Sequence, residues 1–189
     1  MKGNYIGQAW LVLALALCFG VALAGVNTAL KAKIDANKLA DTVGQIPNLV
    51  PGASSGKADF VGGEYVYRAF DADGEQVGWV LPAMGQGFAD RIELLVGLDN
   101  DARKVTGLYI LYNQETPGLG NKIVDLDWRG QFAGKPAEPA LAVIKGKAQK
   151  DNEVEAITGA TISSESVVGI VNQGVAKLRA ALGEANSVR

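Results

Sequence analysis

The sequence contains no histidine. This absence excludes Ser-His-Asp catalysis, histidine general bases, histidine haem ligation and most zinc or copper sites. The single cysteine, Cys18, lies inside an apolar run, so the chain can form no internal disulfide, no Cys-x-x-Cys pair and no cysteine-ligated cluster. We therefore predict neither a metal site nor a catalytic side chain. Any redox or group-transfer chemistry must come from an organic cofactor.

The sequence also lacks an excess of basic residues. Charged residues make up 20% of the 189 residues, and the net charge at pH 7 is −2. A protein that binds nucleic acid by neutralising phosphates needs a basic excess, so we predict no nucleic-acid partner. The length allows one domain plus one accessory element, and the hydrophobic share of 48% is that of a globular chain.

One long apolar run lies near the N-terminus. Residues 9–26 are 18 residues without a charge, and with the residues from Tyr5 onward the run reaches the ~20 that a helix needs to cross a bilayer. Trp10 lies near one end, where interfacial aromatic residues are found. We predict a retained transmembrane anchor over residues 1–30. A cleaved signal peptide is the alternative, because Ala22-Leu23-Ala24 has the small-x-small form of a cleavage site.

Lysines flank the apolar run on both sides, with Lys2 before it and Lys31, Lys33 and Lys38 after it. Positive-inside counting therefore favours neither orientation strongly. We expect a short N-terminal tail inside and an exported domain, as in a signal anchor. The chain would then be a single-pass protein of the cell inner membrane with its domain on the periplasmic side.

The rest of the sequence predicts an α+β fold. We predict a connecting segment over residues 31–57, made of a turn-rich loop at 45–56 and most of a helix that is predicted at 27–43 and begins within the anchor. One domain follows over residues 58–189. Turn residues and alternation predict about four antiparallel strands in it, at residues 63–70, 75–83, 91–99 and 104–114, with a loop at Gly85-Gln86-Gly87.

Helices flank this predicted antiparallel sheet. Trp128 and Phe132 are four residues apart, which predicts a short helix that packs both rings inward. Residues 141–146 indicate another strand. A final helix is expected from about Ser164 to Leu182, with Ser163 and Ser164 as N-cap candidates. Its apolar positions at helical spacing are Val167, Val168, Ile170, Val171, Val175, Leu178 and Leu182.

Residues 158–164, with the sequence TGATISS, directly precede the final helix. Gly159 and Ala160 would let the backbone approach a ligand closely, and hydroxyl groups gather at a helix N-terminus. The free N–H groups and the positive dipole end of a helix favour a phosphate there. The alternative is an ordinary turn whose Ser and Thr residues only cap the helix.

Residues 115–122, with the sequence ETPGLGNK, follow a predicted strand. Two glycines flank a single apolar side chain, Leu119, and a proline stiffens the entry to the loop. Such a loop could lay its backbone and Leu119 against a flat aromatic ligand. It has neither the G-x-G-x-x-G pattern of a dinucleotide fold nor the GK[ST] ending of a P-loop. A structural loop is the alternative.

Taken together, these segments resemble a known family, the G subunit of the Rnf electron-transport complex. The resemblance lies in RIELLVGLD, QETPGLGNKI, FAGK and EAITGATISSESVV, which cover most of residues 85–175, and extends to the N-terminal apolar run. The C subunit of the sodium-translocating NADH:quinone reductase shares the same FMN-binding domain. The short chain favours the Rnf-type protein.

The resemblance implies a covalent FMN. In this family a separate flavin transferase takes FMN from FAD and esterifies its phosphate to the last threonine of an S/T-G-A-T motif, which here is Thr161. Glu155 stands at the acidic position that precedes this motif, where Asp is common. The implied FMN-binding residues are Thr161, Thr158, Gly159, Ala160, Glu115, Thr116, Gly118, Leu119 and Gly120, of which those in the 115–120 loop would lie beside the isoalloxazine ring.

The resemblance also implies a function. The chain would be an electron-relay subunit, not catalytic alone, of a complex that couples electron transfer between ferredoxin and NAD to H⁺ or Na⁺ movement. Its partners would be the other membrane and redox subunits. The lack of histidine agrees, because a flavin relay needs no acid or base side chain poised near neutrality. A membrane-anchored FMN-domain reductase and an anchored binding module without flavin are the alternatives.

Overall fold

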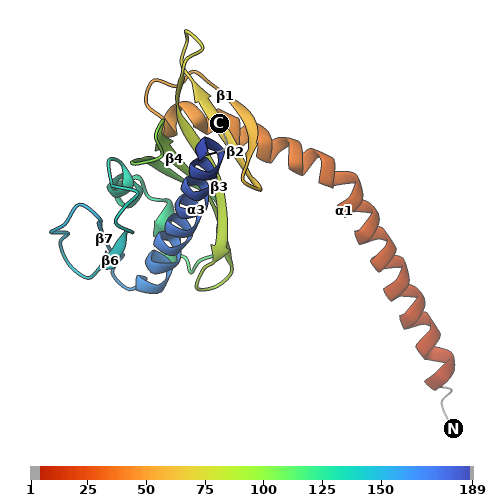
Figure 1. The fold of residues 1–189 in the computed structure, drawn as a ribbon. Helices are drawn as coiled ribbons and strands as arrows, with labels where there is room; N and C mark the ends of the chain where they lie inside the picture. The colour runs from red at the N-terminus through yellow and green to blue at the C-terminus, as the bar shows by residue number, and fades with distance from the viewer. Residues whose placement is uncertain (1–4, 188–189) are drawn as a thin grey trace. The chain divides into compact units, whose positions relative to one another are not determined.

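The structure is a computed structural model that describes residues 5–187. The predicted α+β class, with an antiparallel sheet and flanking helices, is confirmed (Figure 1). In chain order the elements are α1 (Tyr5–Leu49), β1 (Ser55–Val61), β2 (Glu64–Phe70), β3 (Gln76–Gln86), β4 (Arg91–Asp99), β5 (Val105–Tyr112), the 3-10 helix η1 (Gly120–Val124), α2 (Leu126–Arg129), the 3-10 helix η2 (Gly130–Phe132), β6 (Ala142–Ile144), β7 (Glu153–Glu155) and α3 (Thr161–Ser187).

The chain divides into two compact units, Met1–Asp41 and Thr42–Arg189. The second unit begins before residue 58, where the sequence placed the start of the domain. The second unit starts earlier than residue 58 because the last residues of α1 pack against the sheet and because β1 is itself a strand of that sheet. The anchor over residues 1–30 and the connecting segment over residues 31–57 stay predictions.

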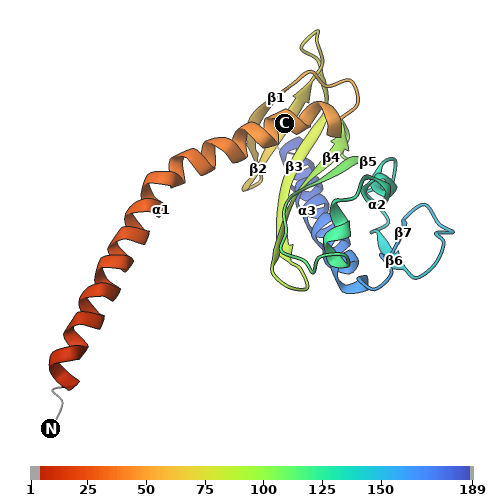
Figure 2. The same ribbon diagram turned by 180° about the vertical axis from the view of Figure 1, so that it is seen from behind.

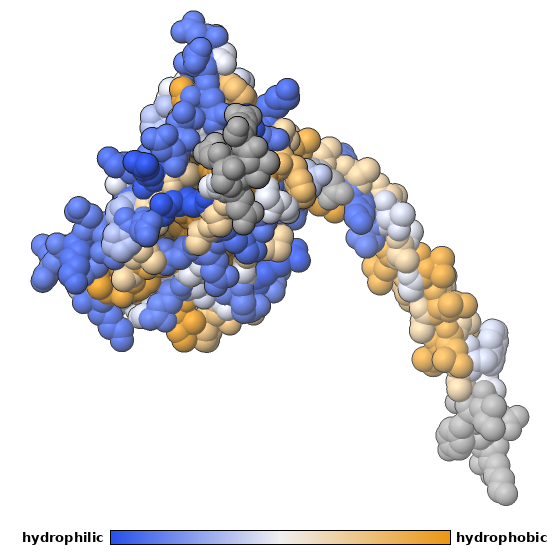
Figure 3. All heavy atoms as spheres, viewed as in Figure 1, coloured by the Kyte–Doolittle hydropathy of each residue, from blue (hydrophilic) through white to orange (hydrophobic). Residues whose placement is uncertain are grey.

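Within the described residues 5–41, the first unit is one continuous helical segment, and its N-terminal part has an apolar surface. Within residues 5–187, one helix is long and apolar enough to cross a membrane, over Ala9–Leu49. Its large side chains are exposed, Leu13 at 69% and Phe19 at 65%. Figure 3 shows the hydrophobic colour concentrated along the N-terminal half of α1. A surface of this kind is stable in lipid rather than in water, so the helix fits a membrane anchor.

The predicted loop over residues 45–56 is wrong in its first part, because α1 continues without a break to Leu49. The turn-rich composition of residues 45–56, which includes Pro47, predicted a loop, but the side chains of Ile46 and Leu49 are buried against the sheet. This burial outweighs the poor helix propensity of the segment. Thr106 Oγ1 also donates to the Leu49 carbonyl at 2.6 Å, which satisfies an acceptor that the helix end leaves free.

Strands β1 to β5 form one antiparallel sheet in which neighbours in sequence are neighbours in space. Of these strands, β1 was not predicted, because its residues show no clear apolar alternation. It pairs with β2 from Ser55↔Phe70 to Val61↔Glu64. Gly62 and Gly63 join the two strands with φ values of +58° and +89°, as a two-residue hairpin turn of type I′ requires.

Both faces of the sheet are covered within the second unit. Helix α3 lies against one face (Figure 1), and the last turns of α1 lie against the other (Figure 2). The α3 side holds the larger core, in which Leu94 and Leu178 are fully buried. Ile46, Val80 and Leu95 are fully buried on the α1 side. This two-sided packing fixes the register of the strands, because a slip of one residue would exchange the two faces.

Two details of the strands differ from the sequence expectations. Gly85 and Gln86 belong to β3, paired with Ile92 and Arg91, instead of to a loop. The short strand β7 was not predicted and pairs in parallel with β6. The predicted inward packing of Trp128 and Phe132 is confirmed, with both rings buried and in edge-to-face contact at 5.3 Å between centroids.

Helix α3 begins at Thr161, three residues before its predicted start. Ser163 and Ser164 therefore lie in its first turn and are not N-caps. Ser164 Oγ accepts the Ile157 N–H at 3.0 Å and donates to the Ala160 carbonyl at 3.0 Å, so it closes the preceding turn from inside the helix. Of the predicted apolar stripe, Leu182 is partly buried and the other positions are buried.

The burial of the α1 end gives a stability prediction. We expect Ile46→Ala to lower the free energy of unfolding of the second unit by about 2–5 kcal/mol, because Ile46 is fully buried. The matched control is Ile34→Ala in the same helix, where the side chain is 46% exposed, and we expect little change there. Denaturant unfolding of both full-length variants in detergent measures the difference. Equal effects would show that the last turns of α1 are not part of the folded domain.

Candidate functional site

A cavity of about 450 Å³ lies where three segments of the second unit meet. These segments are the loop after β3, the 115–120 loop after β5, and the turn that leads into α3. The residues that line the cavity are Phe88, Thr116, Leu119, Gly120, Gly159, Ala160, Thr161, Ile162 and Ser163. The fold therefore brings together the two segments that the sequence singled out, which are about forty residues apart in the chain.

The turn before α3 has a fixed backbone. Ala160 N–H donates to the Ile157 carbonyl at 2.9 Å, and Gly159 has a φ of +82°, a conformation that favours glycine. Helix α3 starts directly after it, so the first N–H groups of a 27-residue helix have no acceptor within the helix. Because Thr161, Ile162 and Ser163 all line the cavity, this electropositive helix end belongs to its wall.

The 115–120 loop is held by its own backbone. Leu119 N–H and Asn121 N–H both donate to the Thr116 carbonyl, at 3.1 and 3.2 Å. Gly118 has a φ of +77°, and its N–H donates to Asn121 Oδ1 at 2.8 Å. The turn leaves the Leu119 side chain 45% exposed at the cavity.

The two loops are in direct contact. A Cβ atom added to Gly159 would lie 3.1 Å from Leu119 Cδ2. A Cβ atom at Gly120 would lie 2.6 Å from Ser163 Oγ and 2.8 Å from Glu115 Oε2. A Cβ atom at Gly120 would require Ser163 or Glu115 to shift, and one at Gly159 would require Leu119 to move by a few tenths of an ångström, so both glycines allow a close approach of the loops.

The structure places the nine residues that the resemblance implied at different depths. Thr116, Leu119, Gly120, Gly159, Ala160 and Thr161 line the cavity. Thr158 and Gly118 are exposed and lie beside it in the chain. Glu115 is buried, with 4% of its surface exposed, and its carboxylate faces Ala89 and Ser163 behind the wall.

Of the lining residues, Phe88 lies outside the two segments that the sequence singled out, whereas Ile162 and Ser163 lie within the predicted 158–164 segment but were not among the nine implied FMN contacts. Phe88 and Ile162 are 60% and 54% exposed, and with Leu119 they form an apolar rim. A signal existed in the sequence, because Ile162 and Ser163 follow Thr161 directly, and Phe88 is a lone aromatic residue in a loop. The sequence could not show that this loop returns to the same end of the sheet.

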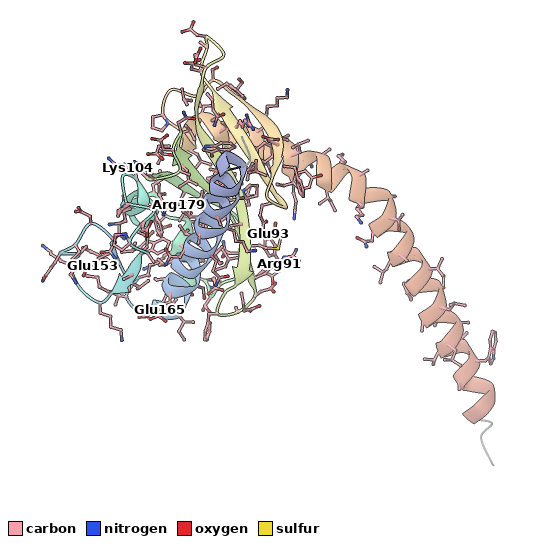
Figure 4. The ribbon with its side chains drawn as sticks, in the orientation of Figure 1. Arg91, Glu93, Lys104, Glu153, Glu165 and Arg179 are labelled. Carbon is pink, nitrogen blue, oxygen red and sulfur yellow. The ribbon has the colours of Figure 1, made fainter. Side chains whose placement is uncertain are left out.

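The acidic position before the TGAT segment has a structural role in this chain. Glu155 Oε1 accepts the Ala148 N–H at 3.0 Å, and the Glu155 carbonyl accepts the Trp128 Nε1–H at 2.8 Å. These bonds tie the 145–150 loop and the aromatic pair to the segment that enters the cavity. Nearby Glu153 (Figure 4) has a pKa below its ordinary value, chiefly because the Gln149 N–H donates to its carboxylate.

The chemistry of the lining is that of an organic ligand site. Its walls are apolar side chains, glycine backbone and hydroxyl groups, and the residues that line it carry no charge. Among residues 5–187, no three His, Cys, Asp or Glu side chains are grouped so that they could hold a metal ion. A cavity of this size and lining fits one small molecule with a flat apolar part and an anionic part at the α3 end.

Comparison with known proteins supports this interpretation. Residues 87–176 match the family described as "FMN-binding domain". The chain is 40% identical over 106 residues to the G subunit of the Na(+)-translocating ferredoxin:NAD(+) oxidoreductase complex of Acetobacterium woodii, covering 55% of this chain and 50% of that protein. It is 38% identical over 119 residues to the G subunit of the proton-translocating ferredoxin:NAD(+) oxidoreductase complex of Clostridium ljungdahlii, covering 63% of each. The chain thus spans between half and two thirds of the length of these relatives.

Solved structures give the same result for the fold. The crystal structure of NqrC from Shewanella oneidensis is similar with a TM-score of 0.55 and 26% identity, over 58% of this chain and 54% of that one. The C subunit of the Na(+)-translocating NADH-quinone reductase from Parabacteroides distasonis is similar with a TM-score of 0.53 and 26% identity, over 60% of this chain and 59% of that one. The resemblance drawn from the two loops is confirmed, because residues 87–176 match the FMN-binding domain family and the relatives include G subunits of ferredoxin:NAD(+) oxidoreductase complexes.

Proposed function

We propose that the cavity holds FMN and that the chain is an electron-relay subunit of an ion-translocating ferredoxin:NAD oxidoreductase complex of the Rnf type. The observation that carries the proposal is the convergence of the 115–120 loop and the Thr161 turn on one cavity. FMN, when bound, supplies one- and two-electron transfer. The chain would carry electrons and would not be catalytic alone.

The residues of the cavity fit this cofactor. Phe88, Leu119 and Ile162 offer apolar surface for a flat ring system. The N-terminal turn of α3 offers N–H donors and a positive dipole end for a phosphate. The volume of about 450 Å³ lies within the range of about 300–1,000 Å³ that is usual for cofactor pockets.

Thr161 is proposed as the covalent acceptor, through an ester between its hydroxyl oxygen and the FMN phosphate. A threonine hydroxyl is a weak nucleophile without a base beside it, and this chain has no histidine. A separate flavin transferase would therefore form the bond. The Thr161 oxygen would replace AMP at the FMN phosphorus of FAD, AMP would leave, and the transferase would take the hydroxyl proton.

A covalent tether suits the proposed location of the domain. We infer that α1 crosses the cell inner membrane once and that the flavin domain lies on the periplasmic side. A cofactor lost outside the cytoplasm is hard to replace, whereas an esterified one stays with the chain. A phosphodiester also carries one negative charge where a free phosphate carries up to two, and the cavity lining holds no cationic side chain to balance a second.

The proposed partners are the other membrane and redox subunits of such a complex. This follows from the relatives, which are named as subunits of sodium- and proton-translocating complexes. A stand-alone FMN-domain reductase would turn over a soluble acceptor without partners, and we expect the purified chain not to do so. An anchored module without flavin would show no flavin at all.

The covalent bond is tested by two substitutions at one position. The full-length chain is expressed with a flavin transferase and examined for flavin fluorescence at its band on a denaturing gel. We expect a fluorescent band for the wild type, none for Thr161→Val, which keeps the shape and removes the hydroxyl, and a fluorescent band for the matched Thr161→Ser. A dark wild-type band, with the transferase active on another acceptor, would contradict the proposal.

A second prediction separates backbone strain from crowding of the cavity. Gly118 and Gly159 both have positive φ, but only a Cβ atom at Gly159 would approach another residue, Leu119. We expect Gly118→Ala to cost about 1–2 kcal/mol of stability and to keep its flavin. Gly159→Val should lose stability too, and in addition it should lose most of the flavin. Unfolding and gel fluorescence are measured together, and full flavin loading of Gly159→Val would show that the turn is not close to the cofactor.

The side of the membrane is tested by thiol labelling. Cys18 is the only cysteine, so Cys18→Ala gives a background without thiols, into which Lys147→Cys is introduced in the exposed loop after β6. We expect a membrane-impermeant maleimide to label this cysteine in intact spheroplasts. Labelling only after permeabilisation would place the domain in the cytoplasm.

A further inference from the structure

Glu115 is a buried carboxylate at the junction of the three segments that form the cavity. Only 4% of its surface is exposed. Its Oε1 accepts the Ala89 N–H at 3.1 Å, and its Oε2 accepts the hydroxyl of Ser163. Ala89 follows the rim residue Phe88, and Ser163 lies two residues after Thr161. One side chain thus connects the loop on which it lies to two other segments that line the cavity.

Two glycines enclose this carboxylate. A Cβ atom at Gly87 would overlap Glu115 Oε1, and one at Gly120 would lie 2.8 Å from Oε2. The backbone of the loop after β3 and the backbone of the 115–120 loop therefore lie close to the two carboxylate oxygens. The carboxylate is shielded from the cavity by Gly120 and Ser163, which do line it.

The hydrogen bonds of Glu115 hold neighbouring protein segments in place, and neither is made to a ligand. Both carboxylate oxygens accept a hydrogen bond, one from the backbone of the loop after β3 and one from a side chain of α3. Hydrogen bonds to a buried carboxylate are stronger than neutral ones, and loss of one leaves a buried group without its partner. The first turn of α3 is therefore held at a fixed distance from the Phe88 loop, and Thr161 is part of that turn.

We propose that Glu115 is a positioning residue that holds the Thr161 hydroxyl and the Phe88 loop in place for flavin attachment, without contacting the flavin. This inference rests on the proposed function of Thr161 as acceptor. It gives Glu115 a role different from the ring contact that the family resemblance implied. The role depends on the hydrogen bond between Glu115 and Ser163, so it can be tested by substitution of either residue.

The experiment measures flavin attachment to the full-length chain, produced without flavin and purified in detergent, on addition of flavin transferase and FAD. The variants are Glu115→Ala, Ser163→Ala and the isosteric Glu115→Gln. The matched control is Glu165→Ala, an exposed glutamate on the N-terminal part of α3 (Figure 4). The second readout is the fluorescence anisotropy of the attached flavin, which a merely stabilising role would not change.

We expect attachment to be about tenfold slower, and the anisotropy of the attached flavin lower, for Glu115→Ala and Ser163→Ala. Glu115→Gln should stay close to the wild type, because its amide oxygen can accept the Ala89 N–H and its amide N–H can donate to Ser163 Oγ. Glu165→Ala should equal the wild type. Ser163→Ala removes a single oxygen atom, so it decides the matter if Glu115→Ala does not fold.

The outcomes distinguish this inference from the proposed function. If the wild type takes up no flavin while the transferase labels a known acceptor, the proposed function fails. If the wild type is labelled and Ser163→Ala matches it in both rate and anisotropy, the positioning role is overturned and the proposed function stands. Attachment to Glu115→Gln as slow as to Glu115→Ala would also overturn it, because charge and not hydrogen-bond geometry would then be decisive.

Discussion

The burial of α3 against the sheet is the constraint on which the site depends. Its apolar stripe, including Val167, Val171 and Leu178, fills one face of the sheet. The contact is close, since a Cβ atom at Gly85 would lie 2.6 Å from Ile170 and one at Gly174 would lie 3.0 Å from Leu81. Because the helix cannot slide or rotate on this face, its N-terminus is fixed at the end of the sheet where the two cavity loops emerge.

The proposed chemistry follows from this fixed helix end and from what the chain lacks. The sequence has no histidine, the side chain whose unperturbed pKa lies near neutrality, and the proposed acceptor and carrier role requires none. The helix N-terminus can stabilise a phosphate, the apolar rim can receive a ring, and the buried Glu115–Ser163 pair keeps the walls in register. Each group supports binding and orientation, and the electron chemistry is left to the cofactor.

Much of this fold could be predicted from the sequence where local patterns were strong. The α3 stripe, the aromatic pair Trp128–Phe132 and the strand over 91–99 all have clear periodicity, and all are confirmed. The sequence-based predictions are wrong where long-range contacts, and not the local pattern, determine the secondary structure. The end of α1 stays helical because Ile46 is buried, and β1 is a strand because β2 offers it a partner through the Gly62-Gly63 turn.

The same limit applies to the site. The TGAT and ETPGLG segments stand out in the sequence, and the structure brings them together. The sequence could not show that Phe88 shares their cavity, nor that Glu115 turns away from it toward Ala89 and Ser163. These are long-range pairings between residues that share no pattern, and only the packing of the loops at one end of the sheet determines them.

The most direct test of the central claim is peptide mapping by mass spectrometry of the chain expressed with a flavin transferase. Trypsin releases the segment that follows Lys150 and ends at Lys177, which contains both Thr158 and Thr161. If Thr161 is the acceptor, this peptide carries the mass of FMN less one water, and fragmentation places the addition on Thr161. An unmodified peptide, or an addition on Thr158 or elsewhere in the chain, would contradict this assignment.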